Sequence, residues 1–118
     1  MLIRIDPGSE APLFAQVAAS VRADIAAGRL TVGDRLPAAR EVAAALEVNL
    51  HTVLRAYQDL RDEGLVDMRR GRGAVVTAAA ADLAALSGDI RELARKARTL
   101  KLSPDSLAAL VKDAADDD

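Results

Sequence analysis

The sequence predicts a mainly α-helical chain that also contains a small two-stranded β-sheet. Apolar residues recur every three or four positions along most of the chain, and two short amphipathic stretches are separated by only three residues. Two short β-prone stretches flank the arginine- and glycine-rich segment 69–73. The 118 residues suit one small domain with an appended segment. Because only Phe14 and Tyr57 are aromatic, the core must be aliphatic and thin.

The N-terminal part is expected to contain a strand and then a helix. Residues 1–6 have the apolar content of a short strand, and the Asp-Pro-Gly-Ser sequence that closes it is typical of a turn. Residues 12–27 predict a helix that Gly28 ends. Its apolar stripe consists of Phe14, Val17, Val21 and Ile25.

Two further helices are predicted after a linking segment at 29–37. They cover residues 38–46 and 50–63, and Glu47-Val48-Asn49 interrupts the apolar pattern between them. Asn49 is a favourable N-cap, and Gly64 is well placed to end the second helix. The inward stripe of that helix consists of Leu50, Val53, Tyr57 and Leu60. This arrangement predicts a helix-turn-helix.

A basic hairpin is expected directly after these helices. Residues 65–68 and 74–77 predict strands, and the glycines in the Arg-Arg-Gly-Arg-Gly segment between them permit the positive dihedral angles of a hairpin tip. Helices followed by such a hairpin predict a winged helix-turn-helix, here a DNA-binding domain over residues 1–77 followed by two C-terminal helices.

The C-terminal region, residues 78–118, is predicted to be a helical hairpin that dimerises. A heptad seam runs through residues 83–100 with members Leu83, Leu86, Ile90, Leu93, Ala97 and Leu100. Ser103-Pro104 begins a last helix, which carries Leu107 and Leu110. An isolated helix of this length is marginal in water, so the seam is expected to pack across a two-fold axis. The alternative is that it folds back on its own domain.

Four separated motifs resemble the DNA-binding domain of the GntR family of bacterial transcription regulators. They are Gly-Asp-Arg-Leu-Pro at 33–37, Arg-Glu-Val-Ala at 40–43, Gly-Leu-Val at 64–66 and Arg-Gly-Arg-Gly at 70–73. The short region after the wing and the sequence of residues 48–57 are similar to the YtrA-type subfamily. This resemblance implies a dimeric repressor, often of a transporter operon. Many family members carry arginine where this chain has Leu50 and Leu54.

The third predicted helix offers side chains suited to the major groove of DNA. Opposite its apolar stripe it presents His51, Thr52, Arg55 and Gln58. Arginine pairs with guanine, glutamine with adenine, and threonine reaches a phosphate or a thymine methyl group. We expect Arg55 to make a base contact, whereas Asn49 is first a helix cap and second a phosphate ligand. The alternative is an ordinary solvated face.

Arginines outside this helix are expected to add contacts to the DNA. Arg35 is a candidate phosphate ligand, and the family resemblance implies that Arg40 also reaches the DNA. The wing candidates are Arg69, Arg70, Gly71 and Arg72, of which Arg70 and Gly71 match wing positions that the family uses. Arginine favours the negative potential of a narrow minor groove. Ion pairs with Asp34 or Glu41 are the alternative for Arg35 and Arg40.

Composition excludes several other classes of protein. Because the chain has no cysteine and one histidine, metal sites made of thiolates or of several histidines are excluded. The sequence also shows no cofactor site and no set of residues suited to catalysis. No apolar run approaches the ~20 residues of a membrane span and no signal peptide is recognisable, so a cytoplasmic location is expected. The net charge of −2 argues mildly against nucleic acid, and residues 1–77, with ten arginines and ten acidic residues, are neutral. However, the candidate arginines are expected to share one surface, and affinity for DNA follows local phosphate neutralisation rather than total charge.

The expected function is therefore transcription regulation without enzymatic activity. The expected partners are a double-stranded DNA operator with an inverted repeat, a second copy of the chain, and a small-molecule effector between the wing domain and the C-terminal helices. The alternative is a winged-helix adaptor that binds proteins and no longer binds DNA, which the near-neutral charge would suit.

Overall fold

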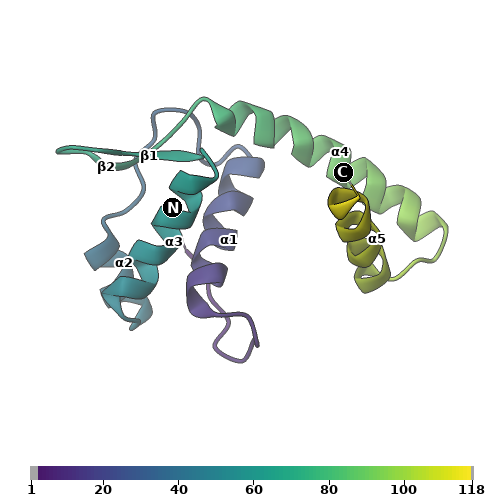
Figure 1. The fold of residues 1–118 in the computed structure, drawn as a ribbon, viewed down its shortest axis with the longest axis horizontal. Coiled ribbons are helices and arrows are strands. Elements are labelled where there is room, and N and C mark those ends of the chain that lie inside the picture. The colour runs from purple at the N-terminus through teal and green to yellow at the C-terminus, as the bar shows by residue number, and fades with distance from the viewer. Residues whose placement is uncertain (1–2, 118) are drawn as a thin grey trace. The chain divides into compact units, whose positions relative to one another are not determined.

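A computed structural model describes residues 3–117 as five helices and one two-stranded antiparallel sheet. The elements are α1 (Leu13–Ala26), α2 (Ala39–Leu46), α3 (Leu50–Asp62), β1 (Val66–Arg69), β2 (Gly73–Val76), α4 (Ala79–Thr99) and α5 (Pro104–Asp116) (Figure 1). The chain divides into two compact units, residues 1–85 and 86–118. The bounds of α1, α2, α3 and both strands lie within one residue of those predicted from sequence, and the mainly helical fold class is confirmed.

The core of the first unit lies between α1, α3 and the sheet. The large side chains that are fully buried come from these elements: Ile25, Leu60, Val17, Val21, Val53, Val66 and Val76. Full burial of such a side chain stabilises the fold by about 1.5–3 kcal/mol. Leu50 packs against this core from the start of α3, as expected from its place on the apolar stripe. Phe14, on the α1 stripe, is only half-buried.

The ends of the helices that form the helix-turn-helix are fixed by local backbone geometry. Asn49 caps α3, since its Oδ1 accepts a hydrogen bond from the His51 amide at 2.8 Å. Gly64, with a φ of 82°, closes the other end, and the Leu65 amide donates to the Leu60 carbonyl at 3.0 Å. Glu47 ends α2 with the same left-handed geometry (φ 56°) although it is not a glycine.

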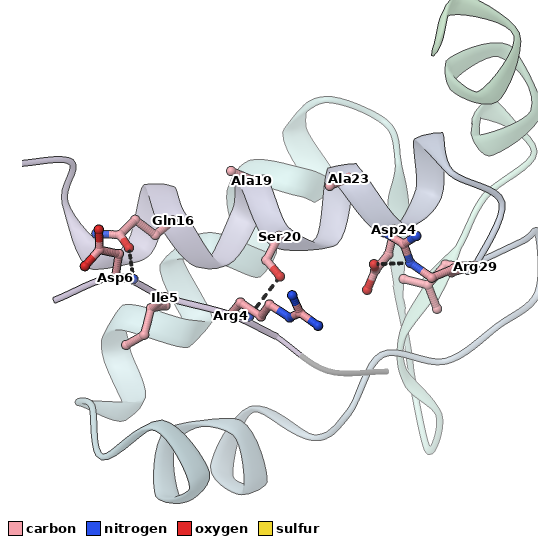
Figure 2. Close-up of a pocket in the computed structure, with 10 residues that line it drawn as sticks. Arg4, Ile5, Asp6, Gln16, Ala19, Ser20, Ala23, Asp24 and Arg29 are labelled. Carbon is pink, nitrogen blue, oxygen red and sulfur yellow. Dashed lines mark hydrogen bonds and ion pairs between the residues drawn. The ribbon is translucent and has the colours of Figure 1, made fainter. Parts of the chain in front are cut away.

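The prediction of a strand at residues 1–6 is wrong for the described residues 3–6, which form no strand. Met1 and Leu2 lie outside the described residues. Ile3 is buried as expected, but the segment runs beside α1 and not beside another strand (Figure 2). The Arg4 amide donates to Ser20 Oγ at 3.0 Å, and the Asp6 amide donates to Gln16 Oε1 at 2.6 Å. Polar side chains of α1 thus accept the hydrogen bonds that these backbone amides would otherwise donate to a neighbouring strand.

The linking segment at 29–37 contains a third backbone segment of the wing sheet. Arg35 forms a β-bridge with Val75 of β2. The Leu36 amide donates to the Ala74 carbonyl at 2.9 Å, and the Val76 amide donates to the Asp34 carbonyl at 2.8 Å. This segment covers one edge of β2 and brings Arg35 next to the wing.

The second unit contains the C-terminal part of α4 and all of α5. The turn between the two helices places Lys101 in the left-handed region (φ 59°), and the Leu102 amide donates to the Ala97 carbonyl at 3.0 Å. Ser103 then caps α5, because its Oγ accepts from the Ser106 amide at 3.1 Å. The predicted start of the last helix at Ser103-Pro104 is confirmed.

Candidate nucleic-acid interface

Helix α3 buries one face and exposes the face predicted from its sequence pattern. Val53, Tyr57 and Leu60 are buried, whereas the DNA candidates Asn49, His51, Arg55 and Gln58 are exposed and Thr52 is half-buried. Leu54 is also half-buried. The exposed face therefore carries donors and acceptors of the kinds that read base edges in the major groove.

Tyr57 connects the middle of α3 to the start of α2. Its hydroxyl donates to the Pro37 carbonyl at 2.6 Å, two residues before α2 begins. Burial and, second, the negative charge of Glu41 raise the pKa of this phenol to about 12. The hydrogen bond therefore fixes α3 against the segment that leads from Arg35 into α2.

The alkaline titration of Tyr57 provides a test of this connection. The folded pKa of about 12 lies above the ordinary tyrosine value of 10.0, so the stabilisation is complete below pH 10 and is lost as the pH rises from 10 through 12. We expect the free energy of unfolding to fall in this range by up to about 1.4 kcal/mol per pH unit. Tyr57→Phe should remove this component. Because the chain has one tyrosine and no tryptophan, phenolate absorbance reports this group alone, and a native midpoint near pH 10 would contradict the burial of this phenol beside Glu41.

The wing presents a cluster of exposed arginines at its tip. The strands pair in the register Val66↔Val76 to Arg69↔Gly73, which leaves residues 70–72 as the turn. Gly71 has a φ of 78°, and the Arg72 amide donates to the Arg69 carbonyl at 3.0 Å. The turn is thus closed by backbone hydrogen bonding, and Arg69, Arg70 and Arg72 are all exposed.

The arginines of the first unit divide into an ion-paired group and an unpaired group. Arg22 of α1 donates through Nε to both oxygens of Glu63 (3.0 and 2.9 Å). Arg29 pairs with the buried Asp24 at 2.8 Å. The longer pairs are Arg61 with Asp62 at 3.4 Å and Arg69 with Asp67 at 3.9 Å.

Within residues 3–117, no carboxylate lies within 4.0 Å of the arginine side chains of Arg35, Arg40, Arg55, Arg70 and Arg72. Asp34, one of the two alternative partners of Arg35, instead accepts from the Thr31 amide at 2.9 Å. The ion pairs considered for Arg35 and Arg40 therefore do not form among the described residues. Part of the acidic residues that make residues 1–77 neutral pair with other arginines, so these five arginines, together with Arg4 near the N-terminus, have no ion pair among the described residues.

Arg55 makes a contact across two helices. Its guanidinium group lies over the ring of Phe14, 3.6 Å from the ring centroid. Phe14 belongs to the first turn of α1, so two helices contribute to this point of the surface. The two residues are far apart in the sequence, and no local pattern links them.

The six seam positions of the C-terminal region do not share one environment. Leu83 packs on the core of the first unit, and Ala97 is buried. Leu86, Ile90 and Leu93 are between 42% and 54% exposed. Leu100 lies just after α4 and is exposed, as is Leu110 of α5, whereas Leu107 is half-buried.

Two hollows occur away from α3 and the wing tip. One is an open groove of about 940 Å³ beside α1, and the residues that line it include Arg4, Asp6, Gln16 and Ser20 (Figure 2). The other is an apolar hollow of about 130 Å³ that Ile25, Val32 and three alanines of α4 help to line. In the described part of the chain, no cluster of histidine and acidic side chains could hold a metal ion. None of the described helices has the length and apolar character needed to cross a membrane.

Comparison with known proteins agrees with the winged arrangement of residues 13–76. This segment, from the first residue of α1 to the last residue of β2, matches the pattern of the bacterial regulatory proteins of the gntR family. The chain belongs to the GntR family. It is therefore a DNA-binding transcription regulator and not an enzyme, as the sequence motifs predict.

Two curated relatives of this GntR protein are regulators with a helix-turn-helix. It is 36% identical over 76 residues to the transcriptional repressor YtrA of Bacillus subtilis, a match that covers 64% of this chain and 58% of YtrA. It is 31% identical over 115 residues to the transcriptional regulator Rv1152 of Mycobacterium tuberculosis. That match covers 98% of this chain and 95% of Rv1152.

Solved structures of GntR proteins resemble this one. YtrA from Sulfolobus acidocaldarius is 42% identical, with a TM-score of 0.60 over 65% of this chain and 81% of that one. The DNA-binding domain of AraR, in complex with its operator ORR3, is 29% identical, with a TM-score of 0.54 over 65% of this chain and 95% of that one. The predicted resemblance to the family and to its YtrA-type members is confirmed.

Proposed function

We propose that this GntR protein is a homodimeric repressor that binds an inverted-repeat operator. Helix α3 enters the major groove, where Arg55 and Gln58 read bases and His51, Thr52 and Asn49 add contacts. Arg35 and Arg40 contact phosphates, and Arg69, Arg70 and Arg72 of the wing enter the neighbouring minor groove. Gly71 lets the backbone of the tip approach the DNA.

The observation that carries this proposal is that, among the described residues of the first unit, five of the six unpaired arginines, all except Arg4, lie at positions assigned to DNA. Affinity for DNA follows the number of phosphates that are neutralised locally, so a net charge of −2 is no obstacle. Arg69 is also assigned to DNA but has Asp67 at 3.9 Å, whereas the arginines of α1 and of the α3 end, which are not assigned to DNA, are ion-paired. An adaptor that binds proteins would have no need for this separation.

The dimer is supported by the apolar side chains of the second unit. Leu86, Ile90 and Leu93 of α4 and Leu110 of α5 are large and exposed. A second copy of the chain would cover them across a two-fold axis. Two copies of α3 would then meet successive major grooves about 34 Å apart, which doubles the few contacts that one copy makes. The proposed dimerisation region lies within residues 78–118, with the exposed side chains beginning at Leu86 because Leu83 packs on the first unit.

The wider biological role follows from the resemblance to YtrA-type regulators. A cytoplasmic repressor of a transporter operon, released from DNA by a small-molecule effector, fits that resemblance.

The proposal is tested by selecting a binding site from random duplexes and measuring affinity at several salt concentrations. We expect an inverted repeat to emerge, with affinity that falls steeply as salt rises and with weak binding to a scrambled duplex of the same composition. Undetectable or salt-insensitive binding would overturn the proposal and favour the protein-binding adaptor.

A further inference from the structure

The contact between Arg55 and Phe14 joins the proposed base-reading residue to a helix outside the helix-turn-helix. The guanidinium lies 3.6 Å from the centroid of the ring, which is close enough for a direct cation–π contact. Arg55 is exposed and Phe14 is half-buried, so the ring is held by the fold while the guanidinium remains at the surface.

Stacking on a ring leaves the hydrogen-bond donors of an arginine available. The five N–H groups of a guanidinium lie in its plane, whereas the ring contacts the face of that plane. Arg22 shows the contrasting case in the same unit, because its Nε donates to both oxygens of Glu63. The stack therefore restricts the Arg55 side chain without using the donors that a guanine would accept.

We propose that Phe14 is a positioning residue for DNA recognition, and that its ring holds Arg55 in the orientation that reads a base. This inference rests on the proposed role of Arg55 at the DNA. An arginine side chain loses much rotamer freedom when it is immobilised in a complex, and a side chain that is already restricted loses less. The ring thus favours the bound state at the one base pair that Arg55 contacts.

Phe14→Leu tests the proposal, because leucine keeps an apolar side chain on α1 and removes the ring. We expect operator affinity to fall about two- to fivefold per half-site, with the loss concentrated at one base pair. That base pair should be the one whose preference Arg55→Ala relaxes by about five- to a hundredfold. Phe14→Tyr is the matched control, since it keeps the ring and should bind within about twofold of the parent chain.

The combination of both substitutions separates positioning from a structural role. If the ring acts through Arg55, Phe14→Leu should cause no further loss in the Arg55→Ala background. A loss that is equal on all duplexes, or one that persists without Arg55, would overturn the inference. So would a rise in affinity, because the ring would then withhold Arg55 from the DNA.

Failure of the inference can be distinguished from failure of the proposed function. If Arg55→Ala relaxes one base pair while Phe14→Leu does not, the base contact stands and the positioning role is wrong. If Arg55→Ala changes no base preference, the assignment of Arg55 to a base is wrong and the inference fails with it.

A second measurement does not require any variant of Phe14 to fold. The chain has one phenylalanine, so incorporation of para-fluorophenylalanine gives one fluorine resonance that reports on this ring. Removing the exposed guanidinium by Arg55→Ala should shift that resonance both in the free protein and in the operator complex. An unchanged resonance in the complex would show that the stack is absent when DNA is bound, which contradicts the proposal.

Discussion

Replacement of Leu86 and Leu93 by aspartate is expected to give a monomer that has lost most of its affinity for the operator. Both side chains are large, apolar and almost half exposed in the single chain (49% and 42%). A carboxylate buried at their positions would have to lose its hydration without a partner charge. Loss of the second copy removes the gain from bivalent binding, so affinity for the full inverted repeat should fall about 10²-fold or more.

Sedimentation and duplex titration together check this result. The mass in solution should halve, while binding to an isolated half-site should stay as weak as that of one copy of the parent chain. Val32→Asp is a suitable control, because it places one aspartate at an exposed apolar residue of the first unit. An intact dimer after the double substitution would show that residues other than this part of the seam hold the two copies together.

Local sequence signals predicted the helix-turn-helix well because its boundaries are set by neighbouring residues. Asn49 caps α3 through an amide two residues away, and Gly64 supplies the positive φ that ends it. The helix therefore begins where the cap predicts and ends within one residue of the prediction. Glu47 shows the limit of such signals, since it takes the left-handed geometry without being a residue that favours it.

Contacts between distant segments could not be predicted in the same way. The bridge between Arg35 and Val75 depends on a sheet edge that only the folded chain creates. The stack of Arg55 on Phe14 depends on how α1 meets α3. The error at residues 3–6 has a similar cause, because alternating apolar residues suit any extended segment, whatever supplies its hydrogen bonds.

The heptad spacing predicted a helix but could not assign each member of the seam to a partner. Leu83 packs on the first unit, although it has the same spacing as Leu86 and Ile90, which are exposed. A period specifies one face of a helix, whereas the surface that covers this face can change along its length.

Net charge was the weakest sequence signal for the candidate interface, because a sum does not record which charges compensate one another. Arg22 and Glu63 cancel at a site between α1 and the end of α3, and Arg29 cancels the buried Asp24. These pairs form only where the folded chain brings the two side chains together. The net charge of −2 therefore could not reveal which arginines remain unpaired.

Substitution of both Arg70 and Arg72 by alanine is expected to weaken binding to every duplex, on the order of a hundredfold at low salt. The two side chains are exposed at the wing tip, and neither has a carboxylate within 4.0 Å among the described residues. Each arginine removed should lower the slope of affinity against salt by about one, so a dimer should lose about four. The measurement is a duplex titration at several salt concentrations.

The matched control is the double variant Arg22→Ala and Arg61→Ala, which removes the same formal charge from arginines that already contact carboxylates at the surface. Its salt slope should stay close to that of the parent chain, because counterion release depends on phosphates neutralised and not on total charge. If the wing arginines enter a narrow minor groove, their loss should also reduce any preference for A·T-rich steps beside the half-site. Equal slopes in the wing and control variants would mean that the wing does not contact the DNA backbone, and that the unpaired charge at its tip serves another partner.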